Sequence, residues 1–327
     1  MRSVYAASQD PDDPLAGLRI GELEPEVPPD WVWVQVRAAS LNHHDLWSLR
    51  GVGLPGDRLP MVLGTDAAGI APDGSKVLVH GVISSRGWEG DETLDPRRTL
   101  LSELHPGTLA ERVAVPASNL VPMPEGMSFA EAACLPTAYL TAYRLLFHAA
   151  DARPGQRVLI QGAGGGVATA AVLLARAAGL HVTVTSRSAA KLERALDLGA
   201  HDAVAGGERV QPVDIVIETV GEATWGHSLR SLRPGGVVAV AGATSGPAPS
   251  ADLNRVFFRS LRVVGSTMGT RAELSRLAAM MKASGVAPVI DTTSDLSSDS
   301  AVRAAFARLL DGESFGKIVL TSEGTAS

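Results

Sequence analysis

The stretch between residues 157 and 264 alternates short apolar runs with longer segments of helical spacing. Val158-Leu159-Ile160 is apolar at successive positions, which is typical of a strand buried on both faces of a parallel sheet. Similar runs recur, with helical segments between them, at residues 181–185, 213–217 and 237–241. This alternation predicts an α/β fold with a doubly wound parallel sheet, which we place at residues 123–264.

The chain on either side of this stretch has a different pattern. Strict period-two alternation in Trp31–Arg37, with further β-rich runs at 77–79 and 110–115, predicts a compact β domain over residues 1–122. The tail, residues 265–327, shows two helical segments and a closing strand at 317–320. We expect this tail to return to the first domain.

A glycine cluster directly follows the run 158–160 and leads into a helix of small residues. Read as A-x-G-x-x-A from Ala163 to Ala168, it departs from the dinucleotide-binding fingerprint at its first and third fixed positions. Glycine lets the backbone turn sharply, and it lets an anion approach the N–H groups at the positive end of the helix. The turn therefore predicts a site for a dinucleotide pyrophosphate, formed by Ala163, Gly164, Gly165, Gly166 and Val167.

The end of the second predicted strand bears on the choice of cofactor. NAD-binding folds of this kind carry an Asp or Glu there, which accepts from the ribose hydroxyls and repels a 2′-phosphate. This chain has Ser186 and Arg187 instead, with Lys191 one helical turn further on. Two cations at the phosphate position favour NADPH (NADP+). The alternative is a solvated arginine and lysine at the edge of a helix.

Composition narrows the class of protein. The chain has 327 residues, enough for two domains, and a formal net charge of −6 that argues against nucleic acid as the main partner. Its one cysteine, Cys134, excludes a disulfide framework and is expected to be a small buried residue. There is neither a leader pattern nor an apolar stretch of about 20 residues, so we expect a cytoplasmic protein without a membrane partner.

Six short motifs follow one another along nearly the whole chain. They are 39–47 (ASLNHHDLW), 64–69 (GTDAAG), 162–168 (GAGGGVA), 231–236 (SLRPGG), 264–269 (VGSTMG) and 315–320 (FGKIVL). Together they resemble the medium-chain dehydrogenase/reductase superfamily, near the quinone oxidoreductases and zinc-type alcohol dehydrogenases. The resemblance implies a GroES-like catalytic domain built from both termini, a Rossmann domain between them, a nicotinamide cofactor and a homodimer. It also implies cofactor contacts from Thr141, Thr219, Val220, Gly242, Ala243, Ser266 and Lys317.

The positions that match the family's catalytic zinc ligands carry Asn42, Thr65 and Thr137, and none of these is a useful zinc ligand. A metal bound by the alternative set His43, His44, Asp45 and Asp66 is disfavoured, because adjacent histidines point in different directions. The resemblance therefore implies hydride transfer without a metal.

Hydride transfer to a carbonyl compound needs a hydrogen-bond donor for the oxygen that gains charge. The candidates are Asn42, His43, His44 and Trp47, in the segment that the family directs toward its active site. His44 matches the position of a proton-relay hydroxyl and would serve as a general acid; alternatively, either histidine only bonds backbone or faces solvent. Asp45 is expected to orient the following turn rather than react.

The leading functional hypothesis is an NADPH-dependent, zinc-independent reductase of a conjugated carbonyl: a quinone, or an α,β-unsaturated ketone, aldehyde or thioester. The alternatives are a zinc-free alcohol/ketone dehydrogenase and an NADPH-binding protein whose redox activity is residual. The loops that would shape a substrate pocket do not name the substrate.

Overall fold

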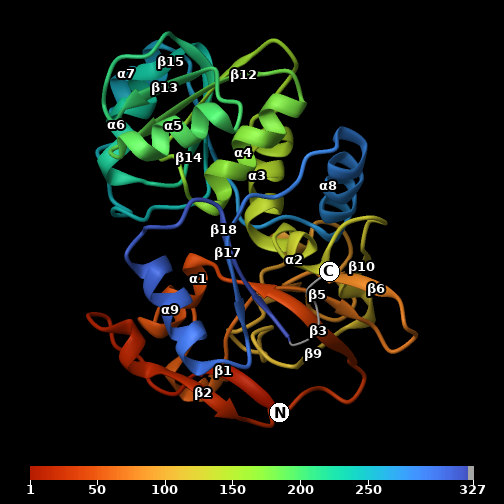
Figure 1. Cartoon of the computed structure of the whole chain (residues 1–327). Coiled ribbons are helices and arrows are strands. Elements are labelled where there is room, and N and C mark those ends of the chain that lie inside the picture. The colour runs from red at the N-terminus through yellow and green to blue at the C-terminus, as the bar shows by residue number, and fades with distance from the viewer. Residues whose placement is uncertain (323–327) are drawn as a thin grey trace. The chain divides into compact units, whose positions relative to one another are not determined.

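The computed structural model describes residues 1–322, and contacts divide the chain into two units. Unit 1 contains residues 1–138, 269–283 and the described residues from 290 onward; unit 2 contains residues 139–268 and 284–289 (Figure 1). The sequence placed the first boundary after residue 122. In the structure, helix α2 (Phe129–Ala132) contacts strands β3 and β5 of unit 1, so the chain up to residue 138 belongs with that unit.

Unit 1 is rich in strands, as the alternating pattern predicts. Its strands are β1 (Arg2–Ala6), β2 (Leu18–Glu22), β3 (Val32–Ser40), β4 (Met61–Val62), β5 (Asp66–Ile70), β6 (Lys76–Val79), β7 (Val82–Ile83), β8 (Thr99–Leu100), β9 (Arg112–Val115), β10 (Leu120–Pro122), β17 (Ile290–Asp295) and β18 (Lys317–Thr321). Its helices besides α2 are α1 (His43–Leu49), α8 (Arg271–Ser284) and α9 (Asp299–Leu310). Within residues 1–322, one sheet has the order β10-β6-β5-β3-β18-β17 with β9 also on β3, and a smaller sheet has the order β2-β1-β4.

The tail of the chain returns to unit 1, as predicted. Strand β18 pairs antiparallel with β3, with Val319 opposite Ser40. Helix α9 buries Val302, Phe306 and Leu309, whose spacing of three and four residues places them on one helical face, in the same core as Leu46 of α1.

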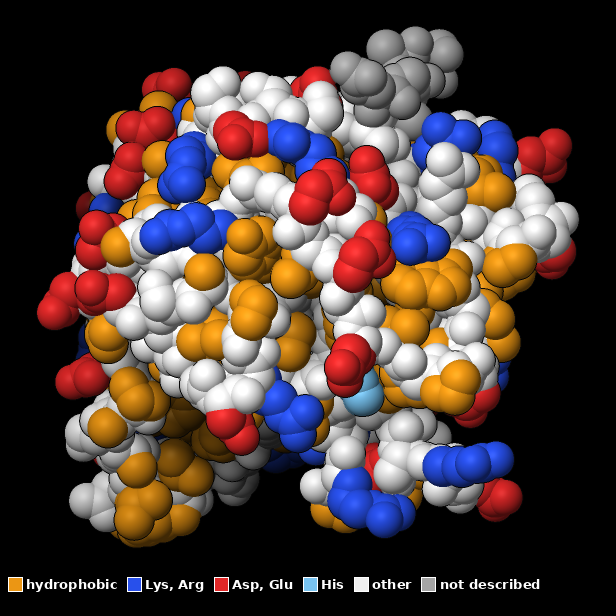
Figure 2. Space-filling view, turned by 90° about the horizontal axis from the view of Figure 1, so that it is seen from below, with side chains coloured by type: hydrophobic (Ala, Val, Ile, Leu, Met, Phe, Trp, Pro, Cys, Tyr) orange, Lys and Arg blue, Asp and Glu red, His pale blue; other side chains and the backbone are white. Residues whose placement is uncertain are grey.

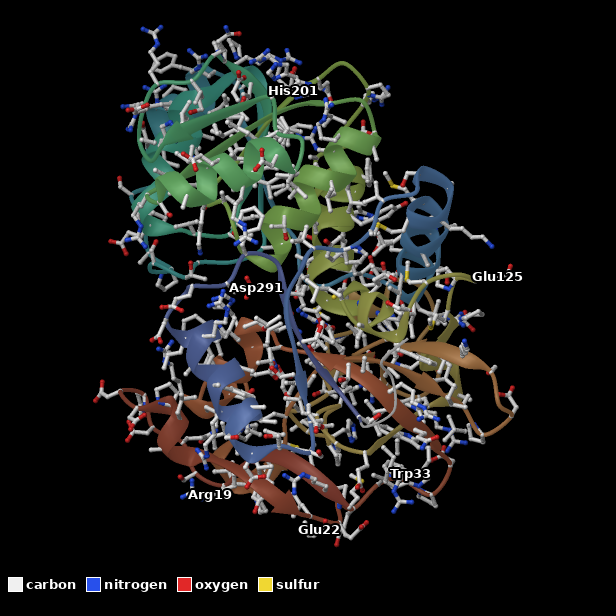
Figure 3. The ribbon with its side chains drawn as sticks, viewed as in Figure 1. Arg19, Glu22, Trp33, Glu125, His201 and Asp291 are labelled. Carbon is white, nitrogen blue, oxygen red and sulfur yellow. The ribbon has the colours of Figure 1, made fainter. Side chains whose placement is uncertain are left out.

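An ion pair fixes α9 beside β17. Asp291 of β17, labelled in Figure 3, accepts from Arg308 Nε at 2.6 Å and from the backbone N–H of Phe315 at 3.0 Å. Because Phe315 lies just before β18, one carboxylate ties together the helix, its strand and the final strand.

Unit 2 is a doubly wound parallel sheet. Its strands are β11 (Arg157–Ile160), β12 (His181–Ser186), β13 (Asp202–Ala205), β14 (Val213–Glu218), β15 (Leu232–Val240) and β16 (Arg262–Gly265), and its helices are α3 (Leu140–Arg144), α4 (Gly166–Ala177), α5 (Ala189–Asp197), α6 (Glu222–Ser231) and α7 (Leu253–Phe258). The strand order is β13-β12-β11-β14-β15-β16, and every adjacent pair is parallel. Val158, Leu159 and Ile160 of the central strand are at most 1% exposed, as expected for a strand covered on both faces. The predicted α/β Rossmann fold is confirmed.

Two local features differ from the sequence pattern. The apolar run predicted a strand from residue 237, but strand β15 begins at Leu232, because an irregularity in its pairing with β14 absorbs residues 233–236. The helical region after α2 contains a π-helical turn at Leu135–Tyr139. None of the helices in residues 1–322 combines the length and the apolar character needed to cross a bilayer.

Candidate cofactor site and active site

The turn between β11 and α4 presents an open helix terminus. Gly162 and Gly164 have φ values of +80° and +106°, which residues with a side chain rarely adopt. Gly165 precedes the first turn of α4, and a Cβ built on it would meet nothing within 4 Å. This 12-residue helix therefore begins without a side-chain cap and beside open space at Gly165, which suits a pyrophosphate at its first N–H groups.

A buried network of side-chain hydrogen bonds lies next to this turn and stabilises it. Gln161, which follows β11, accepts from Thr185 Oγ1 at 2.7 Å and donates to Ser228 Oγ at 3.0 Å. Thr185 in turn accepts from the Gly162 N–H, and Ser228 donates to Glu218 Oε2 at 2.5 Å. The ends of β11, β12 and β14 are thus linked by side chains rather than by backbone alone.

Glu218 is a residue that sequence reasoning missed. Its fully buried carboxylate accepts from the N–H groups of Val220 and Gly221 at 2.8 and 3.0 Å and from the Thr224 hydroxyl. It thereby fixes the loop that contains the predicted residues Thr219 and Val220. The available signal was an acidic residue directly after the apolar run 215–217, where a buried charge requires several donors.

Of the cationic residues predicted to select the cofactor, Lys191 lies beside the glycine turn and Arg187 lies beside Gly206. A Cβ on Gly164 would lie 2.8 Å from Lys191 Cδ and 3.3 Å from Lys191 Nζ, so this side chain lies over the turn. Arg187 is exposed, and its Cγ lies 3.8 Å from the position of a Cβ on Gly206. Within residues 1–322 no carboxylate pairs with Arg187. Ser186 closes β12 and accepts from the Ser188 N–H.

The other predicted residues of unit 2 come from loops after β14, β15 and β16. Thr219 and Gly242 approach closely, since a Cβ on Gly242 would lie 3.0 Å from the Thr219 carbonyl oxygen, and Ala243 borders Gly221 in the same way. The Ser266 hydroxyl is buried and has no hydrogen-bond partner in the described chain. Thr141 lies in α3, 7% exposed, and its contact with a cofactor stays a prediction. Three features of unit 2 fit a phosphorylated dinucleotide. They are the open helix terminus at the glycine turn, the Arg187 guanidinium, which pairs with no carboxylate of residues 1–322, and the Ser266 hydroxyl, which has no partner there.

In unit 1, Asp45 orients its surroundings, as expected. Its carboxylate accepts from the N–H groups of Asn42 at 2.8 Å and Gly64 at 3.0 Å, which ties the start of α1 to the loop before β5. The side chain is fully buried, and this burial raises the pKa of Asp45 from 3.8 to about 6.

The two histidines of α1 have different surroundings. His44 Nε2 lies 3.1 Å from Glu103 Oε1, and its Nδ1 lies 3.4 Å from the Ser102 hydroxyl, so both ring nitrogens have partners. The His43 ring reaches solvent, although surrounding atoms partly desolvate it. This desolvation, followed by the charges of Lys317 and Arg50, lowers the pKa of His43. Trp47 is half-buried, with the Arg50 guanidinium 5.4 Å from its ring centre.

The three positions that match zinc ligands do converge, but on a hydrogen-bonded chain. Asn42 Nδ2 donates to Thr65 Oγ1 at 3.2 Å, and Thr65 Oγ1 lies 3.0 Å from Thr137 Oγ1. The Lys317 ammonium contacts Asn42 Oδ1 at 2.5 Å, the Leu41 carbonyl at 2.7 Å and Asp66 Oδ2 at 3.2 Å. Amide and hydroxyl groups beside a buried ammonium do not fit a zinc ion, which prefers thiolate and imidazole. Within residues 1–322 no group of three His, Cys, Asp or Glu side chains is placed to hold a metal.

Lys317 was predicted to contact the cofactor. In the structure its side chain is 3% exposed and its three protons have acceptors in unit 1, so here the ammonium supports Asn42 and Asp66. Neither sequence position nor spacing indicated this arrangement, because Asn42 and Lys317 are 275 residues apart.

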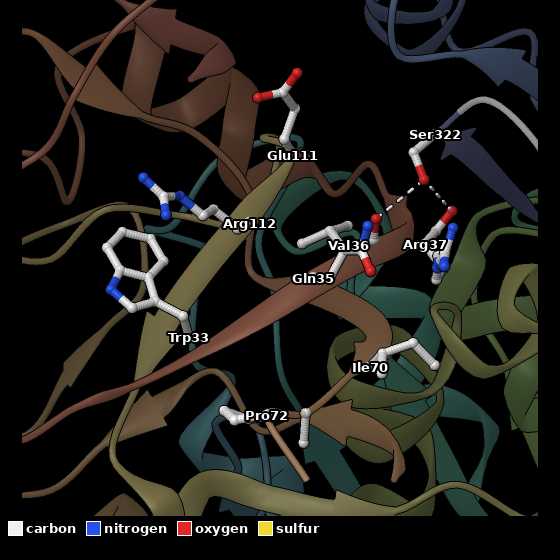
Figure 4. A pocket seen from close by; sticks show the side chains of 10 residues that line it. Trp33, Gln35, Val36, Arg37, Ile70, Pro72, Glu111, Arg112 and Ser322 are labelled. Atoms are coloured by element: carbon white, nitrogen blue, oxygen red, sulfur yellow. Dashed lines mark hydrogen bonds between the residues drawn. The ribbon is translucent and has the colours of Figure 1, made fainter. Parts of the chain in front are cut away.

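Unit 1 also has a hollow of about 670 Å³ that none of the predicted site residues lines. Figure 4 shows Trp33 beside Arg112, whose guanidinium lies 4.4 Å from the Trp33 ring centre. Ser322 closes the opposite side by donating to the carbonyls of Val36 and Arg37. The hollow is thus a separate feature of the β3 surface.

Comparisons with known proteins agree with this architecture. Residues 28–125 match the family model of the alcohol dehydrogenase GroES-like domain, and residues 166–284 match that of the zinc-binding dehydrogenase. A zinc-type alcohol dehydrogenase-like protein of Schizosaccharomyces pombe is 30% identical over 298 residues, which cover 83% of this chain and 85% of that protein. A quinone oxidoreductase of Mus musculus is 31% identical over 225 residues, 64% of each protein.

Two solved structures are similar over almost the whole chain. A crystal structure of an NAD-dependent alcohol dehydrogenase has a TM-score of 0.88 and 32% identity, covering 98% of this chain and 99% of that one. The 2-octenoyl-CoA carboxylase reductase CinF, in complex with NADP and 2-octenoyl-CoA, has a TM-score of 0.89 and 25% identity, covering 98% and 87%. The chain belongs to the medium-chain dehydrogenase/reductase superfamily of oxidoreductases, whose members bind a nicotinamide cofactor.

Proposed function

We propose that the protein is an NADPH-dependent, zinc-independent reductase that transfers a hydride to a conjugated carbonyl compound, such as a quinone or an α,β-unsaturated ketone, aldehyde or thioester. The observation that carries this proposal is the polar chain from Lys317 to Thr137, which occupies the positions matching the zinc ligands. Acceptors whose negative charge spreads over a conjugated system need less help from a Lewis acid than simple ketones do. The quinone oxidoreductase and the 2-octenoyl-CoA carboxylase reductase among the similar proteins support this substrate class.

Arg187 supports the choice of NADPH. The guanidinium is exposed at the end of β12 and finds no carboxylate in the described chain, so it is available to a 2′-phosphate. Arg187→Ala is expected to weaken NADPH binding about tenfold or more and NADH binding little, measured by quenching of protein fluorescence. Arg194→Ala, at an exposed arginine on the helix α5 that follows Arg187 in the chain, is the matched control. Equal losses for both nucleotides would refute the assignment.

The bound nicotinamide would supply the hydride, and the residues of this chain would bind and orient the reactants. The turn at Gly164–Val167 would hold the pyrophosphate through backbone N–H groups. In unit 1, His43 keeps a solvent-exposed ring, whereas His44 is engaged by Glu103. We therefore assign proton exchange with solvent to His43. An unchanged pH profile of turnover in His43→Ala, with loss in His44→Ala, would reverse the two roles.

The second candidate is a zinc-free alcohol/ketone dehydrogenase, which the alcohol dehydrogenase names among similar proteins favour. Consumption of NADPH with quinones and enones but not with simple ketones supports the reductase. The reverse preference supports the dehydrogenase, and binding without turnover of any acceptor supports a nucleotide-binding protein with residual activity. Stoichiometric zinc in the purified, active protein would contradict the zinc-independent reaction.

We also propose a cytoplasmic homodimer that acts on small molecules rather than nucleic acid. On the face shown in Figure 2, acidic and basic side chains are interspersed rather than gathered by sign. Strand β16 is an edge of the unit 2 sheet, and the neighbouring α7 exposes Phe257 and Phe258 by 59% and 79%. An open edge beside exposed aromatic rings suits a second copy of the chain. Phe258→Asp should shift light-scattering mass toward the monomer, whereas Leu94→Asp, an exposed leucine of unit 1, should not.

A further inference from the structure

Thr137 is the outer end of the hydrogen-bonded chain that starts at Lys317. Lys317 is 2% exposed, Asn42 8% and Thr65 1%, whereas Thr137 is the first member with substantial access to solvent. All four residues belong to unit 1. A buried positive charge is therefore connected to the surface of the unit through two side chains and a hydroxyl.

The chemistry of the donors fixes the direction of this chain. An ammonium can only donate, so the atom of Asn42 that faces Lys317 must be the amide oxygen. The Asn42 amide nitrogen then donates its two protons to Thr65 Oγ1 at 3.2 Å and to Asp66 Oδ2 at 2.8 Å. Thr65 is thus an acceptor on the side of Asn42.

Thr65 has one proton of its own, and its position determines what Thr137 can do. The hydroxyl oxygen of Thr137, 3.0 Å away, is the acceptor that the structure places beside the buried Thr65 hydroxyl. If Thr137 donated instead, the Thr65 proton would be left buried without an acceptor, which costs about 1–3 kcal/mol. Thr65 therefore donates, and the Thr137 proton points away from the chain toward an outside acceptor.

The local backbone presents this hydroxyl. Thr137 lies in the π-helical turn Leu135–Tyr139, between Pro136 and Ala138, and wide turns of this kind are frequent at functional sites. Each hydrogen bond in a directed chain polarises the next one, so the buried ammonium makes the Thr137 hydroxyl a better donor than an isolated threonine.

We propose that the Thr137 hydroxyl donates the hydrogen bond to the carbonyl oxygen of the substrate, with Thr65, Asn42 and Lys317 as positioning residues behind it. This inference rests on the proposed reductase function. With a reduced nicotinamide bound, hydride transfer would form a C–H bond at the β-carbon and would move the electrons of the C=C bond toward the oxygen. The Thr137 O–H would stabilise the resulting enolate oxygen. A proton from solvent would then add to the α-carbon of the enolate and give the saturated carbonyl product. NADPH is oxidised, the acceptor is reduced by two electrons, and Thr137 keeps its proton.

The test compares Thr137→Val, which keeps shape and removes the hydroxyl, with Thr137→Ser, which keeps the hydroxyl. Loss of one such donor lowers kcat by about 10²-fold. We expect that loss in Thr137→Val, with unchanged affinity for NADPH, and recovery to within a few-fold of the natural protein in Thr137→Ser. Thr65→Val should lower kcat by a smaller factor, about tenfold, and Thr65→Ser should restore it, which a purely structural role of Thr65 would not predict.

The outcomes separate this inference from the proposed function. If the natural protein reduces quinones or enones and the folded Thr137→Val variant retains full kcat, the donor role is wrong and the reductase stands. If the natural protein reduces none of these acceptors, the proposed function and the inference fall together. Thermal melting of each variant checks folding; if Thr137→Val does not fold, Thr137→Ala and Thr65→Val provide the same comparison.

Discussion

The two units each contain a buried polar cluster, and the clusters are built around opposite charges. In unit 1 the ammonium of Lys317 is paired with Asp66 and with the oxygen atoms of Leu41 and Asn42. In unit 2 the carboxylate of Glu218 pairs with no cation of residues 1–322 and is held by backbone N–H groups and hydroxyls. One cluster is an ion pair with amide support, and the other is a single anion in a cage of neutral donors.

The difference indicates what each cluster can do. A carboxylate surrounded by N–H groups fixes the backbone of a loop, and the loop at Glu218 contains the predicted cofactor residues Thr219 and Val220. A buried ammonium attached to a hydrogen-bonded side chain creates a directed field, which is useful where charge develops during a reaction. The first arrangement suits binding, and the second suits catalysis.

The largest effect is expected from breaking the ion pair of unit 1. Lys317→Met leaves Asp66 buried without its cation, so the free energy of unfolding should fall by about 3–5 kcal/mol. Urea denaturation of both proteins measures this change in the free energy of unfolding. Lys282→Met is the matched control, because Lys282 pairs with Glu125 on the surface and its loss should cost at most about 1 kcal/mol. Similar losses in both variants would contradict the distinction between the buried and the exposed pair.

A second test uses another buried carboxylate of unit 1, that of Asp45. Because burial raises the pKa of Asp45 from 3.8 to about 6, its contribution to stability is fully present below pH 3.8 and is lost as pH rises through about 6. This rise corresponds to about 3 kcal/mol. The unfolding free energy of Asp45→Asn, relative to the natural protein, should therefore improve by up to that amount between pH 4 and pH 8. A pH-independent difference between the two proteins would show that Asp45 is solvated.

A third test addresses the hydrogen-bond donors that surround the buried Glu218 carboxylate in unit 2. Glu218→Gln replaces one acceptor oxygen by an N–H group that faces other donors, so the free energy of unfolding should fall by about 1.5–3 kcal/mol. Cofactor affinity should fall as well, because the loop at residues 219–221 loses its anchor. Glu193→Gln, an exposed glutamate on α5, is the control and should change neither quantity. Unchanged cofactor affinity in a folded Glu218→Gln protein would remove the loop-fixing role.

The smallest effect concerns the thiol near the unit 1 cluster. Burial raises the pKa of Cys134 to about 12, so almost no thiolate is present at pH 8. Iodoacetamide should leave the native protein unlabelled and label it once after denaturation, as mass spectrometry would show. Faster alkylation of Cys134 in Lys317→Met than in the natural protein would show that the unit 1 cluster keeps the thiol inaccessible. Equal rates would show that access to the thiol does not depend on the cluster.

Sequence patterns predicted the parts of the molecule that depend on short-range order. The alternation of strands and helices in unit 2, the glycine turn and the cations at the end of β12 all follow from local spacing and residue type. The return of the tail followed from one strand-like segment at 317–320, which is apolar at residues 318–320. The strand β17 was missed, because Ile290–Asp295 is polar at most positions and is recognisable only by its pairing with β18.

The candidate site was predicted only in part, for a different reason. His43, His44 and Asn42 could be selected by residue type, but their partners could not. Lys317 reaches Asn42 across 275 residues, and Glu103 reaches His44 across 59. Such contacts depend on how strands pair in three dimensions, which no local pattern encodes. The polarised hydroxyl of Thr137 follows only once these pairings are known.

The ammonium at the centre of the unit 1 cluster is attached to the chain by covalent bonds. A metal ion in the same position would be lost to a strong chelator and would have to be acquired from the cell's supply. A lysine side chain is made with the protein and stays with it. If Lys317 polarises the Thr137 hydroxyl as proposed, the protein should keep its activity in cells starved of zinc.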